Sequence, residues 1–155
     1  MPHTYNVTVY TANEEGAGTD ENAYLRLIGN QATAGDYYLD YERYRDAERG
    51  SSWTYGLITD EFLGDIKELY LYVESFNNDS PAWKLDYIEV ASRITGEVKK
   101  WKFPVYSWVG IPNKDPGHPN TINDLWIDTK GVFNTQKSNQ VYDKKNVEYE
   151  YTPLE

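Results

Sequence analysis

The 155-residue chain contains no cysteine, a single methionine and only two histidines. Without cysteine it has neither a disulfide scaffold nor a thiolate metal site. His3 and His118 are too few to build the histidine-rich centre of an iron enzyme. No Ser lies in a Gly-x-Ser-x-Gly motif, and no Gly-rich phosphate loop is present. The sequence therefore predicts that the chain is not an enzyme.

Long hydrophobic runs and an excess of basic residues are also missing. No run approaches the ~20 apolar residues of a spanning helix, and the N-terminus has no signal-peptide pattern, so we expect a soluble or peripheral membrane protein. Lys and Arg number 15 against 25 Asp and Glu, a net charge of -10, which argues against nucleic acid as a partner. Contact with an anionic membrane would need a bridging cation, a neutral surface or inserted apolar side chains.

Aromatic residues, by contrast, are abundant, with 15 Tyr, 5 Trp and 4 Phe. Apolar residues recur with the two-residue period of a half-buried strand in six runs: Tyr5/Val7/Val9, Ala23/Leu25/Leu27, Tyr37/Leu39/Tyr41, Trp53/Tyr55/Leu57, Leu69/Leu71/Val73 and Trp101/Phe103. Turn residues separate these runs at the spacing of a β-sandwich. A slip of the apolar phase between Trp83 and Val90 predicts a bulge. Thr59 to Ile66 alone is predicted to be helical, as a single turn.

The composition changes after Val109, which suggests a boundary near residue 110. Residues 110–123 contain three prolines and several Gly and Asn, typical of a loop or linker. Further on, Val147, Tyr149 and Tyr151 alternate with Glu148 and Glu150 and predict an edge strand. The expected organisation is one sandwich domain over residues 1–110 and a loop-rich C-terminal extension over 111–155.

Five blocks in order resemble the PLAT (lipoxygenase-homology, LH2) domain. They are Gly16-Ala17-Gly18-Thr19-Asp20-Glu21-Asn22, Glu48-Arg49-Gly50, Leu63-Gly64-Asp65-Ile66, the stretch from Pro81 to Val90, and the stretch from Trp101 to Trp108. Together they cover roughly residues 4 to 109, and they resemble most the N-terminal domain of animal lipoxygenases. The resemblance implies an eight-stranded antiparallel β-sandwich, which agrees with the strand pattern.

What the resemblance implies about function is a non-catalytic module that docks its chain onto lipid membranes or a protein partner, often with calcium at the loop tips. Calcium prefers carboxylate, amide and backbone oxygens. Matching or oxygen-rich positions here are Gly16, Gly18, Asp20, Glu21, Glu48, Asn77, Asn78 and Asp79. The pattern departs at Ala82, at Arg45 and at Glu74-Ser75-Phe76, where some relatives carry further polar or acidic residues. The alternative for Asp20 and Asn22 is a turn-capping role.

Lipid contact is implied for Phe76, which borders the second loop, and for Trp108, which matches a lipid-contacting aromatic position of some relatives. Both loop tips are polar or acidic, so we expect weak or calcium-dependent lipid contact, or a protein partner instead. Trp83 and Trp101 are expected to pack in or near the core, and such packing is the alternative to lipid contact for Trp108.

Two other binding classes fit an acidic, tyrosine-rich sandwich. A carbohydrate-binding module with structural calcium would use surface Tyr and Trp to stack on sugar rings. A purely protein-docking domain would use exposed Tyr70, Tyr72 and Tyr106 as contact residues, unless these are half-buried strand residues.

Overall fold

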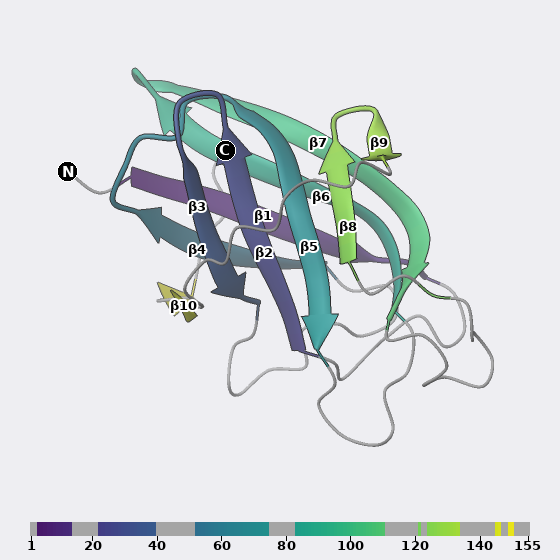
Figure 1. Ribbon diagram of the computed structural model, residues 1–155. Helices are drawn as coiled ribbons and strands as arrows, with labels where there is room; N and C mark the ends of the chain where they lie inside the picture. Colours follow the sequence, from purple (N-terminus) through teal and green to yellow (C-terminus); the bar gives the residue numbers. More distant parts are fainter. Residues whose placement is uncertain are drawn as a thin grey trace.

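The computed structural model describes residues 3–13, 22–39, 52–74, 83–110, 121, 124–133, 145–146 and 149–150. These residues form two β-sheets packed face to face (Figure 1). The first sheet has the order β11-β4-β1-β6-β7 and the second β10-β3-β2-β5-β8-β9. The strands are β1 His3–Thr11, β2 Asn22–Gly29, β3 Thr33–Tyr38, β4 Ser52–Thr59, β5 Ile66–Glu74, β6 Trp83–Ile94, β7 Glu97–Val109, β8 Asp124–Asp128, β9 Gly131–Phe133, β10 Lys145–Asn146 and β11 Tyr149–Glu150.

The predicted all-β sandwich is confirmed. The first eight strands have five or more residues each, whereas β9, β10 and β11 have only two or three. Neighbouring strands pair antiparallel, apart from the short β10, which runs parallel to β3. Within the described ranges no helix is long and apolar enough to cross a membrane.

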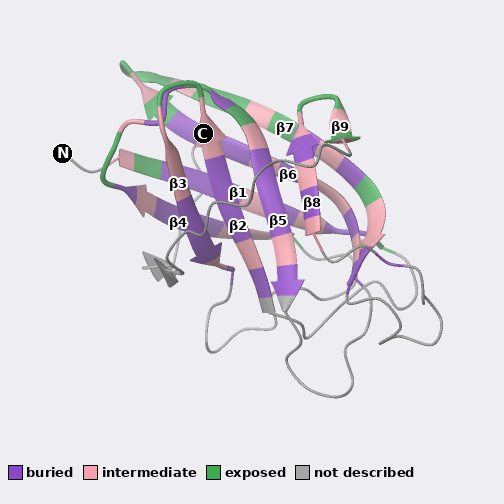
Figure 2. Ribbon diagram, in the orientation of Figure 1, coloured by how far each residue is buried: buried purple, intermediate pink, exposed green. Residues whose placement is uncertain are grey.

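The core lies between the two sheets and is built from alternating residues of β1 to β8 that face the opposite sheet (Figure 2). Tyr5 and Val7 of β1 are fully buried, and so are Leu25 and Leu27 of β2. Trp83 is also buried, and Trp101 packs against the same core, as the sequence predicts. The two-residue period of the sequence is therefore the period of core packing.

Two local predictions had different outcomes. The bulge is confirmed: β6 and β7 change register between Leu85 and Tyr87. The helical turn over residues 59–66 is wrong, because the backbone of this segment bonds to other elements. Leu63 N donates to the Tyr5 hydroxyl at 3.2 Å, and Asp65 N donates to Asn30 Oδ1 at 3.2 Å.

Residues beyond position 110 also contribute to the sheets. Strand β8 pairs with β5 and places Leu125 and Ile127 in the core. Strand β9 follows it across a tight turn. Strand β11 lies at the edge of the first sheet beside β4, where the late Tyr/Glu alternation occurs.

Candidate docking and cation site

Four connections between strands begin and end at the same end of the sandwich. They cover residues 14–21, 40–51, 75–82 and 111–123, and each joins a strand of one sheet to a strand of the other (Figure 1). The opposite end carries the short turns after β2, β4 and β6. We call the first of these ends the loop end.

Pairing between strands brings the first and third of these connections together. Asn22 of β2, which follows residues 14–21, pairs directly with Glu74 of β5, which precedes residues 75–82. On the other sheet, Trp83 Nε1 donates to Thr11 Oγ1 at 2.9 Å, and Ala12 N donates to Lys84 O at 2.9 Å. The two connections therefore start and finish at neighbouring strand ends.

The connection over residues 40–51 joins strands that lie beside those flanking residues 14–21, on the side away from residues 75–82. It follows Leu39, whose N–H donates to Ala23 O at 2.9 Å. It ends at Ser52, which pairs with Tyr10 of β1. In each sheet, therefore, the strand that flanks residues 14–21 lies in the middle. The strands that flank residues 40–51 and 75–82 lie on either side of it.

The predicted calcium ligands belong to these three connections and lie outside the described residues. They are Gly16, Gly18, Asp20 and Glu21 in the first, Glu48 in the second, and Asn77, Asn78 and Asp79 in the third. The predicted lipid contact Phe76 also lies outside. Among the residues that the structure describes, His, Asp and Glu form no cluster of three that could hold a metal.

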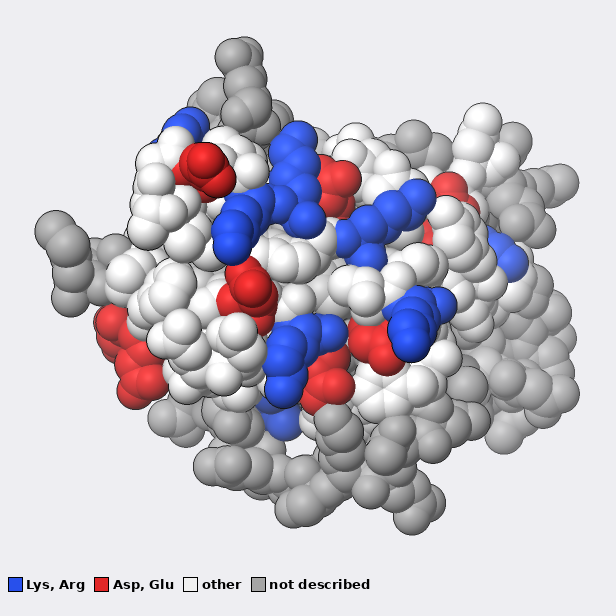
Figure 3. All heavy atoms as spheres, turned by 90° about the horizontal axis from the view of Figure 1, so that it is seen from above, with Lys and Arg blue, Asp and Glu red and all other residues white. Residues whose placement is uncertain are grey.

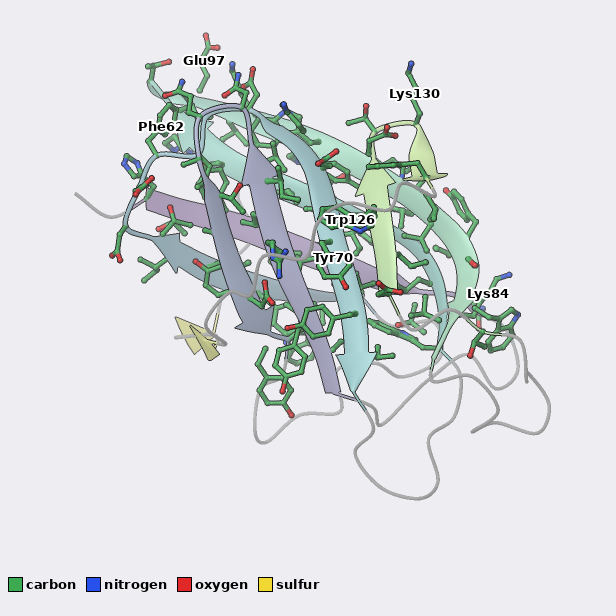
Figure 4. The ribbon with its side chains drawn as sticks, in the orientation of Figure 1. Phe62, Tyr70, Lys84, Glu97, Trp126 and Lys130 are labelled. Carbon is green, nitrogen blue, oxygen red and sulfur yellow. The ribbon has the colours of Figure 1, made fainter. Side chains whose placement is uncertain are left out.

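Trp108 is described and lies at the loop end. It is half-buried near the end of β7 and pairs with Lys84, the second residue of β6. The Lys84 ammonium lies 5.7 Å from the centre of the Trp108 ring, within the range of a cation–π contact. Figure 4 shows Lys84 beside the start of β6, with its charged end directed outward.

The register shift in β6 and β7 presents Tyr106 to solvent. Its backbone φ is 46°, a left-handed conformation that bulky residues rarely adopt, and its side chain is 56% exposed. The hydroxyl-bearing ring therefore projects from the edge strand of the first sheet, two residues from Trp108. Of the three tyrosines expected at a protein contact, only Tyr106 is exposed, because Tyr70 is buried and Tyr72 half-buried.

The outer face of the second sheet is a packed aromatic layer. The ring of Tyr24 stacks on Tyr38 at 5.3 Å and on Tyr72 at 5.2 Å, measured between ring centres. Tyr70 stacks on Trp126 at 4.5 Å, and Figure 4 shows these two side chains lying together on β5 and β8. Ring faces in this layer are thus occupied by neighbouring rings.

An ion pair is built into the same layer. Arg26 donates to the Asp36 carboxylate from two guanidinium nitrogens, from Nε at 2.7 Å and from Nη2 at 3.1 Å, and both residues are buried. The Tyr72 hydroxyl donates to Asp36 at 2.7 Å. The Tyr70 hydroxyl donates to Asp124 at 3.0 Å, and burial together with this carboxylate raises the pKa of Tyr70 to about 12. These contacts fix the outer face of the sheet but expose no reactive group.

Sequence reasoning missed the outward lysines of β6 and β7. Lys102 Nζ lies 4.2 Å from the centre of the Tyr87 ring, and Tyr87 stacks on Tyr10 at 4.2 Å. The signal was present, since Lys100 and Lys102 alternate with Trp101 and Phe103. Taken alone, that alternation indicates only the polar side of a strand.

Comparison with known proteins supports the same reading of the fold. The family model for the PLAT/LH2 domain matches residues 5–131. The polycystin family receptor for egg jelly of Mus musculus is 28% identical over 107 residues, which cover 69% of this chain and 5% of the receptor. Lipoxygenase homology domain-containing protein 1 of Homo sapiens is 33% identical over 96 residues, 62% of this chain and 4% of that protein.

Among solved structures, a coral 8R-lipoxygenase, described as activated by calcium through a C2-like domain, is similar with a TM-score of 0.63 and 28% identity. The match covers 81% of this chain and 16% of the lipoxygenase. The chain thus spans only about a twentieth of the length of the egg-jelly receptor and of the lipoxygenase homology protein. Because the family model covers most of its length, this chain belongs to the PLAT/LH2 domain family.

Proposed function

We propose that this chain is a non-catalytic docking module that attaches to a lipid membrane or a protein partner through its loop end, assisted by calcium. One observation carries the proposal: the strands flanking residues 14–21, 40–51 and 75–82 are neighbours in both sheets. Residues far apart in the sequence are thereby tethered to one end of the molecule.

The donor chemistry of these connections suits calcium. Asp20, Glu21, Glu48 and Asp79 would supply carboxylate oxygens, and Asn77 and Asn78 would supply amide oxygens. Gly16 and Gly18 would let backbone carbonyls turn toward the ion. Bound calcium would offset part of the negative charge that otherwise opposes contact with an anionic membrane. The calcium activation of the related coral lipoxygenase supports this part of the proposal.

Trp108 would contact lipid beside this cation site. It lies at the loop end and is half-buried, and the Lys84 ammonium lies 5.7 Å from the centre of its ring. Indole rings favour the boundary between headgroups and acyl chains. An aromatic ring next to an ammonium group therefore suits the membrane surface.

The docking test is co-sedimentation with phospholipid vesicles, with calcium and with excess chelator. The unmodified protein should pellet with vesicles more strongly in calcium, and Asp20→Ala should lose that increase. Asp60→Ala is the matched control, because Asp60 is exposed at the opposite end of the sandwich. If the protein pellets with neither neutral nor anionic vesicles in either condition, the proposed attachment to a lipid membrane fails.

The alternative, a carbohydrate-binding module, has less support from the described residues. Sugar stacking needs aromatic ring faces open to solvent. The ring of Tyr24 instead stacks on those of Tyr38 and Tyr72. Retention on immobilised polysaccharide without any vesicle binding would favour this alternative.

A further inference from the structure

Charge is unevenly distributed between one strand pair and the rest of the chain. Residues 83–109, which span β6 and β7, hold five Lys or Arg against three Asp or Glu, whereas the rest of the chain holds ten against 22. On the face of the molecule seen from above, Lys and Arg side chains gather among Asp and Glu (Figure 3). The strong net acidity therefore does not extend to every surface.

Four of the five cations lie on the outward side of β6 and β7. Lys100 and Lys102 alternate with Trp101 and Phe103, whose side chains face the core. Lys84 precedes the buried Leu85, and Arg93 is exposed one residue after the buried Ser92. The fifth cation, Lys99, is paired with Asp65 at 3.3 Å.

These four cations form a row with aromatic side chains beside it. From Lys84 to Arg93 the strand extends about 30 Å, at ~3.3 Å per residue. Two acidic residues lie within the same stretch, Glu89 opposite Lys102 and the half-buried Asp86 in the bulge. Tyr87 lies under Lys102, and the exposed Tyr106 projects from the bulge. We define these six residues, Lys84, Tyr87, Arg93, Lys100, Lys102 and Tyr106, as the basic face.

We propose that the basic face binds the anionic headgroups of a phospholipid surface without calcium. The proposal rests on the docking function proposed above but names a second contact surface, which shares Lys84 alone with the loop end. An open two-stranded face carrying a row of long cationic side chains complements a flat sheet of phosphate and carboxylate groups. The exposed ring of Tyr106 suits the headgroup layer, where tyrosine is enriched. The acidic loop end binds anionic lipid only with calcium, whereas the basic face does not require it.

The test uses vesicles of phosphatidylcholine alone and of phosphatidylcholine with phosphatidylserine, in excess chelator and low salt. The unmodified protein should pellet with the anionic vesicles only, and added salt should weaken the binding. Lys100→Glu/Lys102→Glu should lower the partition coefficient at least about tenfold, since it reverses two surface charges. Lys67→Glu/Lys130→Glu is the matched control: both residues are exposed, lie in or beside the second sheet and give the same change in net charge.

The partition coefficient of the control variant should fall less than about twofold. Both variants have the same net charge, so any general repulsion from the vesicles is the same in the two. Equal losses in the two variants would overturn the proposal, and so would absence of chelator-resistant binding by the unmodified protein. Binding that appears only with calcium would agree with the docking function proposed above but would contradict the proposal for the basic face. Retention on heparin that is lost in Lys100→Glu/Lys102→Glu, without vesicle binding, would show that the face takes a soluble polyanion instead.

Discussion

At the scale of single residues, the buried ion pair of Arg26 and Asp36 is sensitive to the loss of either partner. Asp36 accepts two bonds from the guanidinium and a third from the Tyr72 hydroxyl. Asp36→Ala would leave a buried cation without its counterion, so we expect a loss of about 3–5 kcal/mol in the free energy of unfolding. Urea denaturation measures this loss.

Two controls separate charge burial from simple truncation. Arg26→Met/Asp36→Ala should be more stable than Asp36→Ala alone, because no unpaired charge remains. Lys99→Ala removes an ion pair whose side chains are about half exposed, at 46% and 52%, and should cost less than about 1 kcal/mol. A double variant no more stable than the single one would contradict the explanation.

Tyr70 links stability to alkaline pH. Its pKa of about 12 in the folded protein exceeds the usual value near 10, because burial and Asp124 favour the neutral hydroxyl. The stabilisation is therefore complete below pH ~10 and is lost as the pH rises toward ~12, by up to ~2–3 kcal/mol. Urea denaturation across this range should show a smaller decline for Tyr70→Phe. An equal decline in both proteins would assign the effect to other groups.

At the scale of elements, two glycines in turns differ in their surroundings but share a left-handed backbone. Gly64, with φ 77°, is packed against Asn30, and an added Cβ would overlap Asn30 Oδ1. Gly96, with φ 83°, has no atom within 4 Å of an added Cβ. Gly96→Ala should cost about 1 kcal/mol from backbone strain alone, and Gly64→Ala about 1–3 kcal/mol more. Equal thermal shifts in the two variants would show that crowding at Gly64 is relieved.

Strand positions were predictable wherever the two-residue period was regular. Tyr5, Val7 and Val9 are an example, because alternation alone decides which side of β1 is buried. The segment at residues 60–65 was not predictable from local pattern. Its backbone bonds to Tyr5 and Asn30, residues remote in sequence, and such contacts outweigh a weak local helical preference.

The candidate site was only partly predictable. Asp20, Glu21 and Glu48 were identified from their resemblance to the family, and residues 77–79 from their side-chain oxygens. Strand pairing tethers the three connections that carry them together. The basic face was not predicted, because a row of cations across two strands depends on their register. Lys84 and Lys102 share a face only after the register shift is taken into account.

For the whole molecule, charge separates the acidic loop end from the basic face. Residues 14–21 hold four acidic residues and no Lys or Arg, whereas residues 83–109 hold an excess of cations. Without calcium, an anionic surface should therefore attract the side of β6 and β7 and repel the loop end. Calcium would reduce that repulsion and let the loop end approach.

Calcium-assisted docking requires that three connections form one cation site at the loop end. Thermal unfolding with and without millimolar calcium tests this directly, using Asp20→Ala, Glu48→Ala and Asp79→Ala, one variant for each connection, and Asp60→Ala as control. We predict that calcium raises the Tm of the unmodified protein and of Asp60→Ala by about 3–6 °C at roughly ten times the Kd, and that each of the three variants loses most of the rise. An unchanged Tm of the unmodified protein, or a rise retained in all three variants, would contradict the account.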